Sequence, residues 1–347
     1  MSAYQQNSRI FTAQIETQYK VAETGLPRED LRTTKPSPRP LEPEPLLAHE
    51  LVQGTLVKYC SPASRCPPTA VLIHGIMGSR RNMHSFAQRL VKGFPNWQVL
   101  IVDLRCHGES AALTAELHDQ DHSVESAARD VLNLLQSLKM FPEVLIGHSF
   151  GGKVVMSMAD QFGSGVKRLP KPVDVWVLDA LPGEIRSEEM GAQDRPADLI
   201  ATLRSLPMPI ARKSDLVQYL ERLGFSQGIA AWAGTNLLPS HDGVGVTWKF
   251  DLDCISAMYR SYEKTNLWPF LVSPAEGIRV SFVKAEKSSF RWSGRDQEML
   301  EQYGHKLHLL RNSGHWVHTE NPHGLFDILT ESFGIPDIHM RVHNASY

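Results

Sequence analysis

One serine in this sequence lies in a context that could make it a nucleophile. Ser149 is the centre of a Gly-x-Ser-x-Gly pattern, GHSFG at 147–151, which follows an apolar run at 144–146 and precedes an apolar stretch. This order predicts a strand, a sharp turn and a helix, with the serine hydroxyl projecting above the sheet. The alternative is a structural turn serine, but the strand–helix context favours a nucleophilic Ser149.

A nucleophile of this kind needs N–H donors for the negative charge that develops on the attacked carbonyl oxygen. The amide of Phe150, at the start of the predicted helix, is one candidate donor. The second comes from the sequence HGIMG at 74–78, which follows the first strong apolar run. We expect the Ile76 amide to be this second donor, with Met77 as the next choice, and His74 to brace the loop.

Ser149 also needs a base, which is expected to be a histidine late in the chain. Among fifteen histidines, His315 follows an apolar run at 307–310, and the preceding Gly314 frees the backbone to swing the ring toward Ser149. We therefore predict His315 as the base. The remaining candidates are interpreted as local hydrogen-bonding residues or as side chains that face away from the serine: His107, His148, His305, His308 and His318.

Hydrophobic patterning predicts the elements that must position these residues. Apolar runs without polar alternation, typical of strands buried on both faces, occur at 71–73, 99–102, 144–146, 175–178, 280–283 and 307–310. Apolar residues at three- and four-residue spacing predict amphipathic helices at 83–90 and 124–138. The alternation predicts an α/β fold with a mostly parallel, doubly wound sheet and helices on both faces.

Two segments interrupt this rhythm. Residues 1–46 include five prolines between 36 and 45, which predicts an extended arm or linker outside the core. Residues 184–272 lack a strong buried-strand run and are rich in Leu, Phe and Trp, which predicts a helical lid inserted between two strands. The catalytic core is therefore expected in two parts, 47–183 and 273–347.

Composition narrows the function classes. The chain has 347 residues, of which 42% are apolar, so it is not a disordered protein. Its 36 basic and 38 acidic residues give a net charge of −2, so nothing attracts it broadly to nucleic acid or anionic lipid. No apolar run approaches the roughly 18 residues of a membrane span, and the N-terminus lacks the pattern of a secretory signal.

The number and spacing of the four cysteines also bear on the class of protein. Cys60, Cys66, Cys106 and Cys254 are too few for a disulfide framework and lack the spacing of a metal finger, so no metal site is predicted. A local disulfide between Cys60 and Cys66 stays open, but thiols in a reducing compartment fit better. We expect an intracellular protein that is not secreted.

Four motifs together resemble the α/β-hydrolase superfamily over about residues 50–334. They are HG at 74–75, DLRCHGES at 103–110, GHSFGG at 147–152 and SGHW at 313–316. Narrower features are most similar to abhydrolase domain-containing protein 11-like esterases and their plant and bacterial relatives: HGIMGS at 74–79, Gly152-Lys153 and GHWVH at 314–318. The resemblance implies an α/β-hydrolase fold and esterase or acylglycerol lipase activity. It makes a plastid or a mitochondrion a plausible compartment.

The acid that completes a catalytic triad is the open point. The resemblance implies an aspartate after the run at 280–283, but that position is occupied by Ser288. Asp179 ends the preceding run at 175–178 and is our first choice, since a carboxylate there can still reach His315. Asp253 in the insertion is the alternative acid, with a helix cap as its structural interpretation. Glu286 is a third candidate.

These residues predict acyl transfer to water through an acyl-enzyme on Ser149. The apolar insertion favours a carboxylic ester or thioester with an apolar acyl group as substrate. No cofactor is required, and no phosphate loop or dinucleotide fingerprint is present. The alternatives are a hydrolase-fold ligand receptor with slow turnover, a non-catalytic partner protein, or another serine-dependent reaction such as C–C hydrolysis, peptidase action or acyl transfer to another acceptor.

Overall fold

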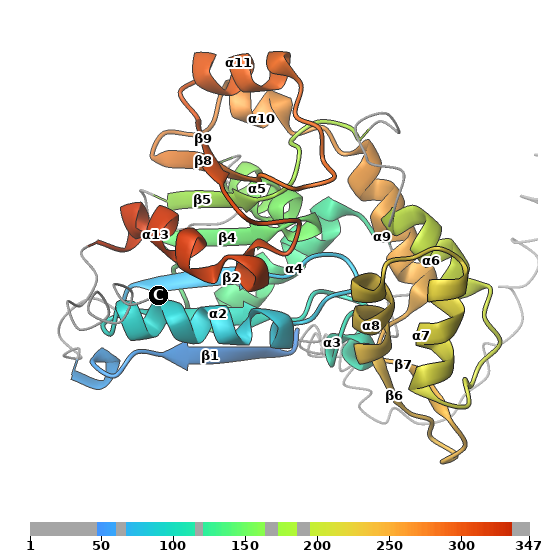
Figure 1. Ribbon diagram of the computed structural model, residues 1–347. Helices are drawn as coiled ribbons and strands as arrows, with labels where there is room; N and C mark the ends of the chain where they lie inside the picture. Colours follow the sequence, from blue (N-terminus) through green and yellow to red (C-terminus); the bar gives the residue numbers. More distant parts are fainter. Residues whose placement is uncertain (1–46, 60–66, 115–120, 164–172, 186–194, 335–347) are drawn as a thin grey trace, which may run out of the picture. The chain divides into compact units, whose positions relative to one another are not determined.

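A seven-stranded sheet forms the centre of the computed structural model, which describes residues 47–59, 67–114, 121–163, 173–185 and 195–334 (Figure 1). The predicted proline-rich arm and the Cys60–Cys66 pair lie outside the described residues. The strand order is β1-β3-β2-β4-β5-β8-β9. Strand β1 pairs antiparallel with β3, and the other neighbours pair in parallel, so the predicted mostly parallel α/β sheet is confirmed.

The strands of this sheet are β1 (His49–Gln53), β2 (Thr69–Ile73), β3 (Gln98–Val102), β4 (Val144–His148), β5 (Val173–Leu178), β8 (Ile278–Ala285) and β9 (Lys306–Leu310). The helices outside the insertion are η1 (Val57–Tyr59), α2 (Arg80–Gly93), α3 (Ser110–Leu113), α4 (Val124–Ser137), α5 (Phe150–Gly163), α11 (Gly294–Gln302), α12 (Val317–Glu320) and α13 (Pro322–Phe333).

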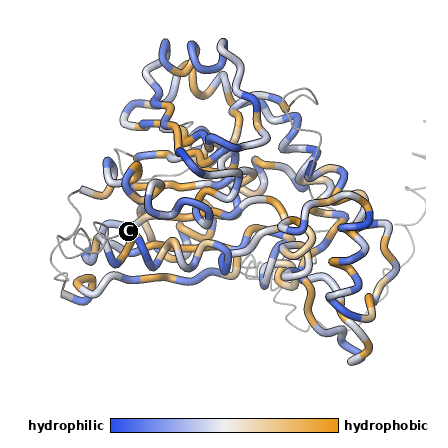
Figure 2. Tube along the Cα trace, in the orientation of Figure 1, coloured by the Kyte–Doolittle hydropathy of each residue, from blue (hydrophilic) through white to orange (hydrophobic). Residues whose placement is uncertain are grey.

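All six predicted apolar runs lie within strands, and β2, β3, β4 and β5 are buried at every position, as expected for strands covered by helices on both faces of the sheet. Alternate residues of β2 show this directly. Val71 and Ile73 belong to the core shared with α4 and α5, whereas Leu72 packs in the second core with α2 and α13. Figure 1 shows helices on both sides of the sheet, and Figure 2 shows many hydrophobic residues along its central strands.

Strand β1 has no counterpart in the sequence-based prediction. Its sequence HELVQ contains two adjacent apolar residues, and its side chains are half-buried or exposed. It gains its partner only through the tertiary structure, where the register joins His49 to Val102 and Gln53 to Gln98 at the edge of the sheet. Edge strands are exposed on one side, so they need no apolar run.

The segment between β5 and β8, which we call the insertion, contains α6 (Pro196–Arg204), α7 (Lys213–Arg222), α8 (Gln227–Thr235), α9 (Leu252–Lys264) and α10 (Trp268–Val272). It also holds a short hairpin of β6 (Leu237–Pro239) and β7 (Val246–Trp248), which the sequence did not predict. These three-residue strands are half-buried or exposed and therefore lack an apolar run. Helices α6 and α7 contribute buried leucines to the same hydrophobic cluster as α4 and α5.

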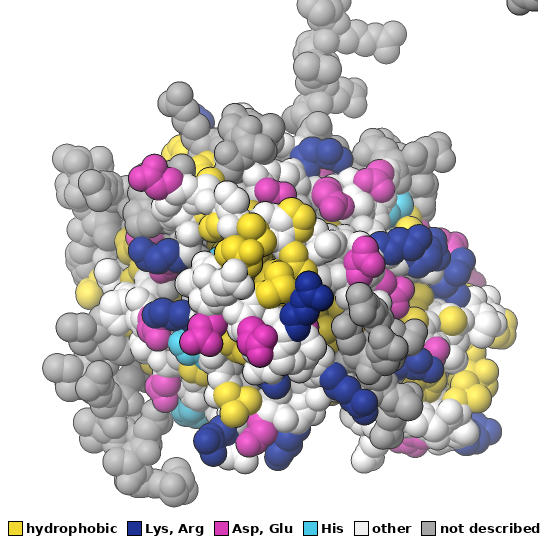
Figure 3. All heavy atoms as spheres, turned by 90° about the horizontal axis from the view of Figure 1, so that it is seen from above, with side chains coloured by type: hydrophobic (Ala, Val, Ile, Leu, Met, Phe, Trp, Pro, Cys, Tyr) yellow, Lys and Arg dark blue, Asp and Glu magenta, His cyan; other side chains and the backbone are white. Residues whose placement is uncertain are grey.

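Charged side chains of both signs are interspersed on the face seen in Figure 3, and hydrophobic side chains gather there in small groups. This distribution agrees with the net charge of −2. Among the described residues, none of the helices combines the length and the apolar character needed to cross a membrane.

Candidate active site

The turn between β4 and α5 holds Ser149 in a strained conformation. Its φ angle is 52°, a left-handed value that costs energy for any residue except glycine. Two glycines make the turn possible. A Cβ atom on Gly147 would lie 2.0 Å from the carbonyl oxygen of Gly151, and one on Gly151 would lie 2.6 Å from the carbonyl oxygen of His74. The serine is thereby presented at the mouth of a cavity next to the amino end of α5.

His315, after β9, and Asp179, after β5, lie within hydrogen-bonding distance of each other. Nδ1 of His315 lies 2.7 Å from Oδ2 of Asp179. The Asp179 side chain is fully buried and also accepts hydrogen bonds from the Ala285 amide at 3.0 Å and from the Ser288 hydroxyl at 2.6 Å. Asp179 follows β5 at a φ of 49°, and the three donors fix the direction of its carboxylate.

The other two candidate acids have different partners. Asp253 is largely exposed and pairs with Arg204, whose Nε lies 2.8 Å from Oδ1. Glu286 accepts a hydrogen bond of 2.8 Å from the Asn312 amide and braces that turn. Among the described residues, Asp179 is thus the carboxylate that the structure brings to His315.

The amides of Ile76 and Phe150 are the predicted oxyanion donors, and no acceptor for either is found among the described residues. Met77, the second choice, differs because its amide donates to Nε2 of His107 at 2.9 Å. That ring in turn donates from Nδ1 to the Arg105 carbonyl at 2.8 Å. Burial, and then the neighbouring His74, lower the pKa of His107 to about 3, so it stays a neutral acceptor.

Three further imidazoles surround the site in neutral form. His74 donates from Nδ1 to the Gly75 carbonyl and accepts at Nε2 from the Leu104 amide, so it braces the loop as predicted. His148 donates from Nε2 to the His315 carbonyl at 2.7 Å, and burial holds its pKa well below the usual value. Burial and His315 also lower the pKa of His318 to about 4. None of the three can serve as a cation at neutral pH.

The cavity beside Ser149 has a volume of about 640 Å³, which lies within the usual range for small-molecule sites. The core supplies Ser149, His315 and the loop at 74–78, and the insertion supplies apolar side chains opposite them. The apolar residues that line the cavity, from the core and the insertion together, are Ile76, Met77, Met83, Pro196, Leu199, Ile229, Trp232, Phe290 and Trp316. The rings of Trp232 and Trp316 lie 5.9 Å apart and join the insertion to the segment that follows His315.

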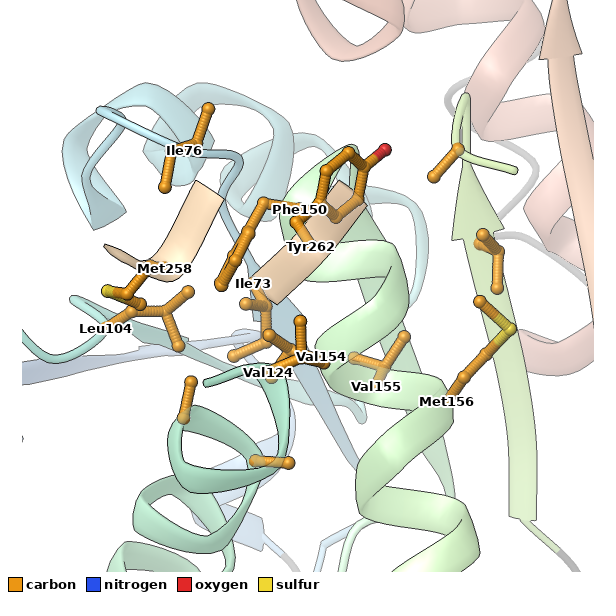
Figure 4. Packing of buried hydrophobic residues seen from close by; sticks show 14 of the residues in the cluster. Ile73, Ile76, Leu104, Val124, Phe150, Val154, Val155, Met156, Met258 and Tyr262 are labelled. Atoms are coloured by element: carbon orange, nitrogen blue, oxygen red, sulfur yellow. The ribbon is translucent and has the colours of Figure 1, made fainter. Parts of the chain in front are cut away.

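Two residues behind the nucleophile were not predicted as functional. Lys153, in the first turn of α5, is completely buried and donates from Nζ to the carbonyls of Gly183, Tyr262 and Thr265 at 2.6, 2.7 and 2.8 Å. The Tyr262 ring lies under this ammonium and 5.8 Å from the Phe150 ring (Figure 4). The signal that could have identified Lys153 was a lysine among the apolar residues of the first two turns of this helix.

Known proteins share the fold and part of the sequence. The sequence profile of the alpha/beta hydrolase family matches residues 70–328. The sn-1-specific diacylglycerol lipase ABHD11 of Mus musculus is 30% identical over 264 residues, which cover 76% of this chain and 80% of that protein. Esterase YbfF of Escherichia coli is 26% identical over 257 residues, or 73% and 87% of the two chains. A solved marine microorganism esterase is 22% identical, has a TM-score of 0.64, and covers 82% of this chain and 98% of that chain.

Proposed function

Because the chain belongs to the alpha/beta hydrolase family and is close to ABHD11-like esterases, we propose that it is a serine hydrolase for carboxylic esters or thioesters with apolar acyl groups. Its relatives include proteins named lipase and esterase, so the chain is an esterase-like hydrolase at the general level. The proposal adds the nucleophile, the acyl-enzyme and the kind of acyl group.

In the proposed reaction, Nε2 of His315 takes the proton of Ser149 while the serine oxygen attacks the acyl carbonyl. The Ile76 and Phe150 amides donate to the oxygen that becomes negative. The carbonyl re-forms, the alcohol or thiol departs with the proton from His315, and an acyl-enzyme remains. Water, deprotonated by the same histidine, then releases the acid. Asp179 orients His315 and stabilises its charged form.

The observation that supports this proposal most strongly is the 2.7 Å contact between His315 Nδ1 and Asp179 Oδ2. It favours the ring tautomer in which Nδ1 carries the proton and Nε2 is free to act as a base. His315 and Ser149 line the same cavity. The contact also favours Asp179 over Asp253 as the acid, because Asp253 pairs with Arg204.

The substrate class follows from the wall that faces the serine. Leu199, Ile229 and Trp232 of the insertion and Phe290 after β8 present apolar surface to the cavity. Burying an acyl chain there yields about 0.8 kcal/mol per methylene group. An apolar acyl group therefore fits better than a charged one, and the insertion acts as a lid.

The test is labelling with a fluorophosphonate probe, followed by turnover of p-nitrophenyl esters of increasing chain length. The unmutated chain should be labelled and should turn over the esters, whereas Ser149→Ala should do neither. Asp179→Asn should lose kcat by several orders of magnitude, and the matched variant Asp253→Asn should retain it. Absence of labelling would refute the nucleophile. Labelling without turnover would favour a slow ligand receptor, and normal kcat in Asp179→Asn would refute the acid.

A further inference from the structure

Three metal-binding side chains from distant parts of the chain meet outside the proposed catalytic site. Cys106 lies in the turn after β3, His122 precedes α4, and Cys254 lies in the first turn of α9. One ligand atom from each lies within 4.8 Å of the others. Their exposed fractions are 3%, 9% and 5%, and neither cysteine is in a disulfide. Their separation in the sequence explains why no metal site was predicted from spacing.

The distances within this cluster approach those of a metal site. Sγ of Cys106 lies 3.6 Å from Nδ1 of His122, and Sγ of Cys254 lies 3.2 Å from Nε2 of the same ring. Zinc–sulfur and zinc–nitrogen bonds of about 2.3 and 2.0 Å place the ligand atoms of a tetrahedral site about 3.5 Å apart. The sulfurs face different ring nitrogens, so binding of one ion requires the imidazole to turn until one nitrogen faces both sulfurs.

We propose that Cys106, His122 and Cys254 form a structural binding site for Zn²⁺. Thiolate and imidazole ligands select zinc over magnesium or calcium, which prefer oxygen. Two thiolates balance the two charges of the ion, so the ligated cluster is neutral, which suits a buried position. Binding forms two zinc–sulfur bonds and releases the two thiol protons to water, so no oxidant or reductant is needed.

A carboxylate lies beside Cys254 at the start of α9. Oδ1 of Asp251 accepts hydrogen bonds from the amides of Asp253 and Cys254 at 2.9 and 3.0 Å and so caps α9. A water molecule as the fourth ligand would complete a tetrahedral shell and keep the ligated cluster neutral.

A zinc ion here would join the insertion to the core. The Asp251 amide already donates to the Cys106 carbonyl at 3.2 Å, so the start of α9 lies against the turn after β3. Further along α9, Met258 and Tyr262 pack among core residues beside Phe150 (Figure 4). The ion would therefore fix the helix that packs behind the proposed oxyanion donor. Zinc binding at these three residues does not depend on the proposed hydrolase reaction.

The test uses the full chain, kept reduced with a non-thiol reductant, stripped of metal with a chelator and titrated with Co²⁺. We expect one Co²⁺ per chain with an intense thiolate-to-cobalt charge-transfer band. One equivalent of Zn²⁺ should remove the band and raise the midpoint of thermal unfolding by several degrees. Cys254→Ser and His122→Asn should lose the intense band or at least half of its intensity, together with the rise in midpoint.

Two control variants establish that the ion binds at these three residues. The double variant Cys60→Ser/Cys66→Ser should keep the band, which excludes the other two cysteines, and Ser149→Ala should keep it whether or not the serine is a nucleophile. If Cys254→Ser fails to fold, X-ray absorption of the zinc-loaded chain should show two sulfurs at about 2.3 Å and a nitrogen at about 2.0 Å. Absence of the band in the reduced chain, an unchanged band in Cys254→Ser, or a Cys106–Cys254 disulfide without metal binding would overturn the proposal.

Discussion

The hydroxyl of Ser288 donates a hydrogen bond of 2.6 Å to Oδ2 of Asp179. Ser288 occupies the position after β8 where the family resemblance implies an aspartate, and Asp179 follows the neighbouring parallel strand β5. The carboxylate that contacts His315 therefore follows β5, and a serine hydroxyl occupies the corresponding position after β8. Oδ2 accepts hydrogen bonds from this hydroxyl and from Nδ1 of His315, so Ser288 helps to fix the position of the His315 ring.

Ser288→Ala should lower kcat by roughly tenfold with little change in KM, because a hydrogen bond to a charged group contributes about 1.5–3 kcal/mol and the carboxylate loses one of its three donors. Steady-state kinetics on a p-nitrophenyl ester measure this. Ser137→Ala, on the exposed side of α4, is the matched control and should keep normal kcat. An unchanged kcat in Ser288→Ala would show that the hydroxyl only fills space.

Stability should fall in mild acid because of His318. Its pKa is about 4 in the folded chain and near the ordinary value of 6.5 when unfolded, so the unfolded state binds more protons between these values. The stabilisation from keeping this ring neutral is complete above pH 6.5 and is lost as the pH falls toward 4. Each proton that only the unfolded state binds increases the slope of the free energy of unfolding against pH by about 1.4 kcal/mol per pH unit.

Urea unfolding between pH 7 and pH 4.5 measures the slope of the free energy of unfolding against pH. His318→Gln should reduce this slope by an amount that corresponds to about one proton. His107, with its pKa of about 3, contributes in the same direction and remains in the variant, so a reduced slope should persist. An identical slope in both proteins would mean that His318 is not the group that resists protonation.

Lys153→Met should reduce the free energy of unfolding by about 3 kcal/mol or more, because it leaves three buried carbonyls without their shared donor. The carbonyls belong to Gly183, Tyr262 and Thr265, so the loss should also loosen both ends of the insertion. Lys249→Met is the control, since this half-buried lysine donates to one carbonyl, that of Thr235, and should cost less than about 1 kcal/mol.

Denaturant titration gives the two free energies, and limited proteolysis reports on the insertion, which should be cut faster in Lys153→Met than in Lys249→Met. Equal losses in the two variants would contradict a specific role for the buried ammonium.

Trp232→Ala should reduce kcat/KM for an eight-carbon ester by about tenfold and leave an acetate ester nearly unaffected, because it removes apolar wall that only a longer chain contacts. The matched control is Trp248→Ala, since Trp248 stacks on Phe250 and is not among the residues that line the cavity. The ratio of kcat/KM values for the two esters is the readout. A ratio that changes equally in both variants would place the acyl chain elsewhere.

The sequence by itself predicted the features that depend on short-range physics. The apolar runs predicted six of the seven strands of the sheet, and the glycines around Ser149 predicted the sharp turn, because a left-handed φ and close backbone approach are local steric matters. His315 was predicted from the same kind of evidence, a flexible Gly314 after a strand. Strand β1 was missed because its sequence HELVQ contains no apolar run, whereas the other edge strand, β9, does contain one.

Only the tertiary structure decided which distant side chains meet. Asp179 and Asp253 were open alternatives because each is separated from His315 by many residues, and the strand order brings one of them to the ring. The burial of Lys153 under the insertion and the cluster of Cys106, His122 and Cys254 have the same origin. Such contacts depend on how strands and helices pack, which no local pattern of residues encodes.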